Sequence, residues 1–117
     1  MIKVINIKEF GIKQSWFRIE NKIPANWIYI GRGSVLGNWF KITPKTNRKQ
    51  VIQLYKEWLW FKIKIKDQPV LAELARLVLL HKHHGELVLC CHCKPLPCHG
   101  DIIKSCLEWI ETKQLKK

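Results

Sequence analysis

Four of the chain's five cysteines fall within nine residues, interleaved with histidines and prolines. The segment is Cys90-Cys91-His92-Cys93-Lys94-Pro95-Leu96-Pro97-Cys98-His99-Gly100-Asp101. Thiols and imidazoles bind zinc, and they also act as nucleophiles and bases. The residue types and their spacing therefore make residues 91–101, here called the thiol loop, a candidate site.

A metal centre is the first interpretation of the thiol loop. Cys91 and Cys93 are two residues apart at the end of a predicted strand, so their side chains point to one side. The two prolines then hold a turn that returns the chain to two further candidates. Three thiols and an imidazole suit tetrahedral zinc, and an iron–sulfur cluster is the second metal considered. The predicted metal ligands are Cys91, Cys93, Cys98 and His99.

Catalysis is the second interpretation, and it stays open beside the first. Cys98 falls at the start of a predicted helix, where the helix dipole favours a thiolate. His99 could take a proton, and Asp101 could orient a base or act as one. Cys90 and Cys106 are interpreted differently, as buried core cysteines, because Cys106 has helical spacing from its apolar neighbours.

A second candidate site lies earlier in the chain, in residues 31–38, here called the glycine loop. Three glycines in seven residues let backbone N–H groups approach a ligand. The spacing matches neither the P-loop nor the dinucleotide fingerprint. The loop predicts a cradle for a phosphate, carboxylate or sugar, with a plain tight turn as the alternative. Its predicted ligand-binding residues are Gly31, Arg32, Gly33, Ser34, Gly37 and Asn38.

The elements that must position these loops follow from hydrophobic periodicity. Strands are predicted at residues 2–7, 15–19, 27–30 and 86–91, and helices at residues 47–65, 69–84 and 98–113. Residues 61–66 also fit a strand. The order favours a small, mainly parallel, Rossmann-like α/β sheet with helices packed on its faces. The glycine and thiol loops then leave the sheet at one edge, and they face each other across a crevice if the strands at residues 27–30 and 86–91 are neighbours.

Composition narrows the class of protein further. The 117 residues are sufficient for one domain, and 47% of them are hydrophobic. A net charge of +12 favours a nucleotide, a nucleic acid or another phosphate-bearing partner, although 17 of the 21 basic residues are lysine rather than arginine. No stretch is apolar enough for a signal peptide or a membrane span, so a cytoplasmic protein without disulfides is expected.

Both loops together resemble domain-of-unknown-function family 4326, whose members occur in bacteria and bacteriophages. The resemblance covers about residues 27–110, and it implies an α/β fold with both loops at the site. This chain has Trp39 where the family usually has proline, and His92 where it commonly has tryptophan. The matching residues are Tyr29-Ile30-Gly31-Arg32, Gly37-Asn38-x-Phe40, Arg48, Tyr55, Glu73-Leu74-Ala75 and Cys91-x-Cys93-x-Pro95-x-x-Cys98-His99-Gly100-Asp101.

The expected function is binding of a nucleotide or nucleic-acid-derived anion in the crevice, by an enzyme that acts on nucleotides or modified bases. Arg32, Ser34 and Asn38 would hold the ligand. Cys98, His99 and Asp101 are the predicted catalytic residues. The alternative is a non-catalytic, zinc-stabilised nucleic-acid-binding or adaptor module, in which exposed tryptophans stack on bases. Neither the substrate nor the oligomeric state follows from the sequence.

Overall fold

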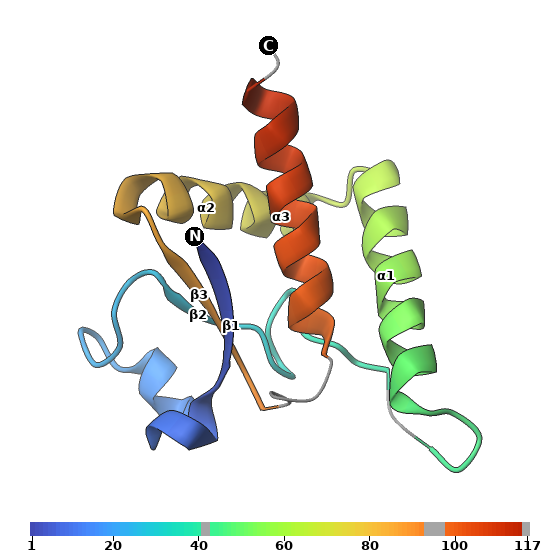
Figure 1. Cartoon of the computed structure of the whole chain (residues 1–117), viewed down its shortest axis with the longest axis horizontal. Coiled ribbons are helices and arrows are strands. Elements are labelled where there is room, and N and C mark those ends of the chain that lie inside the picture. Colours follow the sequence, from blue (N-terminus) through green and yellow to red (C-terminus); the bar gives the residue numbers. More distant parts are fainter. Residues whose placement is uncertain (41–42, 93–97, 116–117) are drawn as a thin grey trace.

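A computed structural model of the chain describes residues 1–40, 43–92 and 98–115 (Figure 1). The side chains of residues 114 and 115 are outside this description. The elements, in chain order, are β1 (Ile2–Asn6), η1 (Ile7–Phe10), η2 (Gln14–Arg18), β2 (Trp27–Tyr29), α1 (Arg48–Lys64), α2 (Gln68–His84), β3 (Leu87–Cys91) and α3 (His99–Leu115).

The three named strands form one parallel sheet in the order β1-β3-β2. Asn6 pairs with Cys91, and Tyr29 pairs with Cys90, so the carboxyl ends of all three strands lie at the same edge. All five residues of the central strand β3 are buried, which explains its unbroken apolar run. The predicted α/β class and the parallel pairing are confirmed.

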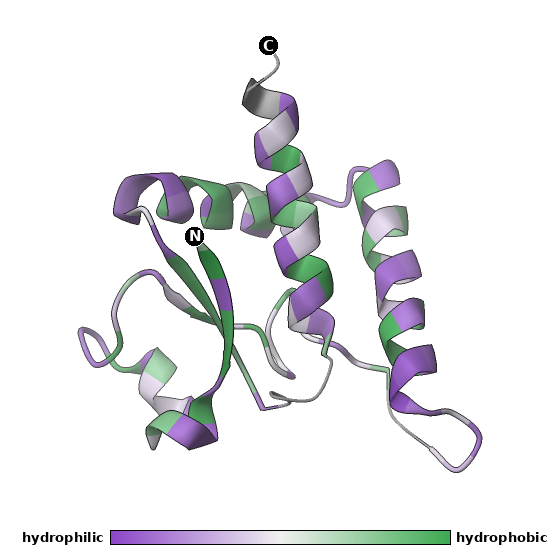
Figure 2. Ribbon diagram, in the orientation of Figure 1, coloured by the Kyte–Doolittle hydropathy of each residue, from purple (hydrophilic) through white to green (hydrophobic). Residues whose placement is uncertain are grey.

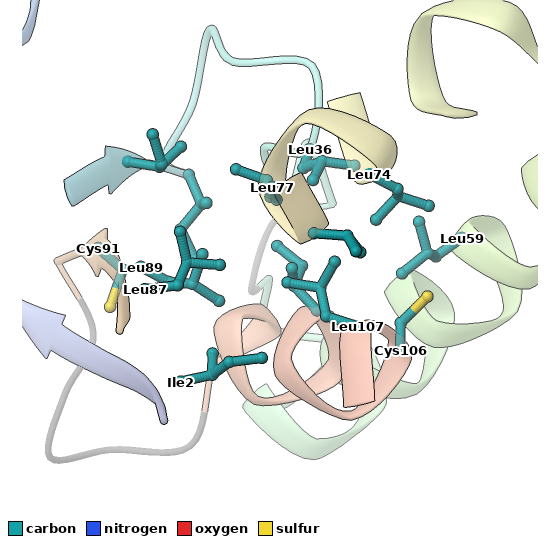
Figure 3. Packing of buried hydrophobic residues seen from close by; sticks show 14 of the residues in the cluster. Ile2, Leu36, Leu59, Leu74, Leu77, Leu87, Leu89, Cys91, Cys106 and Leu107 are labelled. Atoms are coloured by element: carbon teal, nitrogen blue, oxygen red, sulfur yellow. The ribbon is translucent and has the colours of Figure 1, made fainter. Parts of the chain in front are cut away.

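Helices α2 and α3 pack on one face of the sheet, and α1 packs against these two helices. Their inward side chains meet those of β1 and β3 in a single apolar cluster (Figure 3). Leu59, Cys106 and Leu107 pack where α1 meets α3. Along each helix, hydrophobic bands alternate with hydrophilic ones, whereas β3 is hydrophobic along most of its length (Figure 2).

The opposite face is covered by the segment that contains η1 and η2. Ile7, Val88 and Cys90 form its buried centre, and Phe17 packs beside Tyr29 at a ring distance of 5.7 Å. The predicted strand at residues 15–19 is therefore wrong, because residues 15–18 form part of the 3₁₀ helix η2 and Ile19 follows its end. Phe17 gains its burial by lying on the sheet rather than by extending it, so local β-propensity did not decide its conformation.

Local caps mark the ends of α1 and α2, within one residue of the predicted helix bounds. Asn47 forms a reciprocal capping box with Gln50 at the start of α1. Asp67 caps α2, and Gly85 ends it with a φ of 74°. Because α1 continues to Lys64, the alternative strand at residues 61–66 is wrong. No helix in the described parts of the chain is long and apolar enough to cross a membrane.

Candidate functional site

A pocket of about 480 Å³ opens at the carboxyl edge of the sheet, between the glycine loop and the thiol loop. Arg32 from the first loop and Cys98 from the second both line it. The two loops share the pocket because β2 and β3 are neighbours and parallel. The described lining residues are Gln14, Tyr29, Gly31, Arg32, Asn38, Phe40, Arg48, Val51, Ile52, His92, Cys98 and His99.

Hydrogen bonds within the glycine loop fix its shape. The Ser34 hydroxyl donates to the carbonyl oxygen of Gly31 at 2.6 Å, and the Asn38 Oδ1 accepts from the Phe40 amide at 2.9 Å. The loop is also anchored from α1, because the buried Tyr55 hydroxyl donates to the Leu36 carbonyl at 2.6 Å. Ser34 and Asn38 therefore use these polar atoms to shape the loop.

The predicted ligand-binding residues divide between two hollows. Gly31, Arg32 and Asn38 line the main pocket. Arg32 and Asn38 also line a smaller hollow of about 270 Å³, whose wall contains Gly33, Ser34 and Gly37. Gly37 lies so close to the carbonyl oxygen of Gly31 that a Cβ at this position would clash with it. Only glycine, which has no Cβ, fits there without a shift of the backbone. The glycines thus allow close backbone packing within the loop.

His99 connects the thiol loop to the strand that precedes the glycine loop. Its buried ring places Nε2 at 2.6 Å from the carbonyl oxygen of Ile30. A carbonyl can only accept, so Nε2 carries a proton and donates it to this bond. The ring also meets Tyr55 edge to face at 5.1 Å. These contacts give His99 a positioning role within the site.

The start of α3 is held in place by Asp101 and Gly100. The Asp101 Oδ2 accepts from the backbone amide of Cys98 at 3.3 Å, which caps the helix just before its first residue. A Cβ on Gly100 would lie 2.7 Å from a methyl carbon of Val4 and 2.9 Å from the end of Ile30. Glycine therefore lets the helix approach the sheet closely and brings Cys98 to the pocket.

Two of the predicted zinc ligands have their sulfur atoms close together. The Sγ atoms of Cys91 and Cys98 are 3.7 Å apart, and the Cys91 thiol donates to the Ile5 carbonyl oxygen at 3.3 Å. Two thiolates on one tetrahedral zinc would be separated by about 3.8 Å, given zinc–sulfur bonds of about 2.3 Å. Cys93 lies outside the described residues. Within the described ranges, no three histidine, cysteine or acidic side chains form a metal-binding group.

The remaining described cysteines belong to the core, as predicted. Cys90 and Cys106 are buried. Burial raises the pKa of Cys90 to about 12, helped by the neighbouring Cys91, and raises the pKa of Cys106 to about 11. Both side chains are therefore protonated at neutral pH, which makes them poor nucleophiles.

Several lining residues were missed by reasoning from local sequence alone. Arg48, at the first position of α1, was identified only through the family resemblance. Tyr29 places its hydroxyl 3.4 Å from Nε2 of His92, and their rings meet edge to face. One signal was available: the chain has only four arginines among 21 basic residues, and two of these four line the pocket.

The family model described as "Domain of unknown function (DUF4326)" matches residues 17–109. The chain belongs to the DUF4326 family. The match includes both the glycine loop and the thiol loop, and it begins earlier in the chain than the resemblance at about residue 27 indicated. Separate searches of the curated proteins and of the solved structures found no significant match.

Proposed function

We propose that this DUF4326 chain binds a nucleotide or a nucleic-acid-derived anion in the pocket between the two loops. The observation that carries the proposal is the presence of Arg32, Arg48 and Cys98 in the lining of one pocket. Its volume of about 480 Å³ is in the range typical of small-molecule sites. Two guanidinium groups favour a phosphate, because their planar donors match its oxygen atoms.

The electrostatics of the lining support an anion. None of the described lining residues is Asp or Glu. Arg48 is the first residue of α1 and His99 is the first residue of α3, so both helices present their N-terminal ends to the pocket. The partial positive charge of a helix N-terminus stabilises negative charge nearby. These features add to a net charge of +12 over the whole chain.

Aromatic side chains support a ligand that also carries a base. Tyr29, Phe40 and His92 line the pocket together with the arginines. Flat aromatic rings stack against nucleobases, and the arginines would hold the phosphate. An inorganic anion would make no contact that uses these aromatic rings, whereas a nucleobase would stack on them, so we favour a nucleotide.

The enzymatic form of the proposal assigns chemistry to Cys98. Cys98 belongs to the lining of the pocket, although its side chain is buried, and it lies at the N-terminal end of α3, where the helix dipole favours a thiolate. Asp101 caps the helix at Cys98, and His99 anchors it to the sheet. His92, beside the Tyr29 hydroxyl, is an additional candidate for proton transfer. The proposed reaction class is processing of a nucleotide or modified base.

Isothermal titration calorimetry tests the binding proposal. The probes are ribonucleoside and deoxyribonucleoside 5′-monophosphates, the matching nucleosides and inorganic phosphate. A monophosphate should bind more tightly than its nucleoside, and Arg32→Gln should weaken it by at least about tenfold, because charge-assisted hydrogen bonds contribute about 1.5–3 kcal/mol.

Arg76→Gln is the matched control for charge. Arg76 lies on α2, pairs with Glu73 and is not among the described residues that line the pocket. It should leave nucleotide affinity within about twofold of wild type, because charges at such exposed sites contribute little. Equal losses in both arginine variants, or equal affinity for nucleotide and nucleoside, would refute the proposal.

The 3.7 Å separation of the Cys91 and Cys98 sulfur atoms favours a second candidate function. In this alternative, zinc stabilises the thiol loop of a non-catalytic nucleic-acid-binding or adaptor module. Cys93 and His99, the other two predicted ligands, would complete the ligand set, with the Nε2–H of His99 held by the Ile30 carbonyl oxygen. A reducing, cytoplasmic location would keep these thiols available to the metal.

A further inference from the structure

The smaller hollow adjoins the main pocket and shares part of its wall. Arg32 and Asn38 line both spaces, and the hollow continues past them to Trp39 and Trp58. Its volume of about 270 Å³ is a little over half that of the main pocket. A ligand that fills the main pocket could therefore extend into this second space beside Arg32.

Trp39 gives the second space an aromatic surface. Its ring stacks on Phe40, with centroids 4.4 Å apart and planes inclined by 24°. Phe40 lines the main pocket, so the stacked pair spans the boundary between the two spaces. Although one face of the indole is covered by Phe40, 61% of Trp39 is exposed. Single exposed apolar side chains are common on protein surfaces, but an exposed indole in the wall of a hollow beside an arginine offers a face on which a base can stack.

We propose that the pocket takes a nucleotide within a single strand of nucleic acid, and that the base of the neighbouring nucleotide stacks on Trp39. This inference rests on the proposed nucleotide site and names its substrate class. Arg32 stands between the two spaces, where the phosphate that links the two nucleotides would lie. The chain's net charge of +12 also favours a strand over a mononucleotide, because each additional phosphate adds to the electrostatic attraction between ligand and protein.

The stacking contact predicts a defined gain in affinity. Stacking of one base on an aromatic side chain contributes about 1–3 kcal/mol, which corresponds to about fivefold to 150-fold. Dinucleotides are tested with the flanking residue on the 5′ side and on the 3′ side of the bound nucleotide, and one of the two arrangements should bind at least about fivefold more tightly than the mononucleotide. Both RNA and DNA versions are compared by calorimetry at one fixed salt concentration.

Variants of Trp39 test whether this residue is the source of the gain. Trp39→Ala should reduce dinucleotide affinity to the mononucleotide level and leave mononucleotide affinity within about twofold, while Trp39→Phe should retain most of the gain. Trp109→Ala is the matched control, because Trp109 is a half-exposed tryptophan on α3 that contacts Trp60 instead. It should retain the full gain.

The outcomes separate this inference from the proposal on which it rests. If mononucleotides bind but dinucleotides bind no more tightly, the proposed nucleic-acid strand is refuted as the ligand, while the proposal of a nucleotide-binding pocket is retained. The strand is also refuted if Trp39→Ala retains the gain, or if this variant weakens both ligands equally. If neither ligand binds, both proposals fail. Thermal unfolding of each variant confirms that the substitutions leave the fold intact.

Discussion

The imidazole of His99 and the backbone carbonyl of Ile30 are joined by a buried hydrogen bond of 2.6 Å. His99 opens helix α3, and Ile30 immediately follows β2 and precedes the glycine loop. The bond therefore connects the two loops on either side of the pocket. Its loss should affect both the stability of the fold and the shape of the site.

His99→Ala should lower the free energy of unfolding by about 3 kcal/mol. The substitution leaves a buried carbonyl oxygen without its donor and opens a cavity beside Tyr55. His99→Gln should cost only about 1 kcal/mol, because its amide can donate to the same oxygen. Urea denaturation measures both. His83→Ala is the control, because His83 is exposed at a helix end, and it should change the free energy of unfolding by less than about 0.5 kcal/mol. If His83→Ala and His99→Ala destabilise the protein equally, the role assigned to His99 is wrong.

Gly100→Ala should destabilise the protein by about 1–2 kcal/mol, although alanine is the better helix former. The added Cβ would lie 2.7 Å from a Val4 methyl carbon, and the β-branched valine side chain has little freedom to move away. Adding Val4→Ala removes that contact. A double-mutant cycle should then give a favourable coupling between the two substitutions, and additive effects would count against the clash.

Metal analysis separates the two candidate functions. The zinc hypothesis predicts about one zinc per purified chain, and it predicts that Cys98→Ser loses both the metal and the fold. The enzymatic hypothesis predicts metal-free protein and a folded but inactive Cys98→Ser variant. Cys106→Ala, at a core cysteine, should retain whatever metal the wild-type protein holds. A stable and active Cys98→Ser protein would argue against both functions.

Stability should fall at alkaline pH because of the core thiols. Burial raises the pKa of Cys106 from its ordinary 9.0 to about 11 in the folded state. The folded protein then holds a proton that the unfolded chain releases, so the stabilisation is complete below about pH 9 and is lost as the pH rises through 11. Each such thiol contributes a slope of about 1.4 kcal/mol per pH unit in that window.

Cys106→Ala isolates this effect from the titration of the lysines. Lysines contribute similarly to both proteins, so the difference in unfolding free energy between wild type and variant reports on the thiol. Across about pH 9–11 that difference should shrink as the pH rises. A difference that stays constant with pH would show that Cys106 has the same pKa in the folded and unfolded states.

The sequence predicted the elements whose local signals agree with their packing. The helices predicted at residues 47–65 and 69–84 agree with α1 and α2 to within one residue, because Asn47, Asp67 and Gly85 cap or end these helices through local interactions. By contrast, Leu54 and Leu79 have helical spacing from the buried apolar residues of α1 and α2, yet both are exposed. Periodicity identifies an apolar stripe, but the neighbouring elements decide how far around the helix burial extends.

The candidate site was predictable only in part, for a similar reason. The predicted parallel strands place Arg32 and Cys98 together only because β2 and β3 are neighbours, and that adjacency is supplied by the structure. Gln14 and Ile52 reach the pocket from η2 and α1, whose positions depend on packing against the sheet rather than on any local pattern. The hydrogen bonds that engage Ser34 and Asp101 within their own loops likewise depend on backbone geometry.

Strand β1 lies outside the stretch of chain that matches the family, yet β3 and α3 depend on it (Figure 1). It pairs with β3 along its whole length. The carbonyl oxygen of Ile5 accepts a hydrogen bond from the Cys91 thiol, and the side chain of Val4 packs closely against Gly100 of α3. A fragment trimmed to residues 17–109 would leave one side of the central strand without hydrogen-bond partners. The unit that is recognised by homology is thus smaller than the unit that folds, and the boundaries chosen for expression should include the first seven residues.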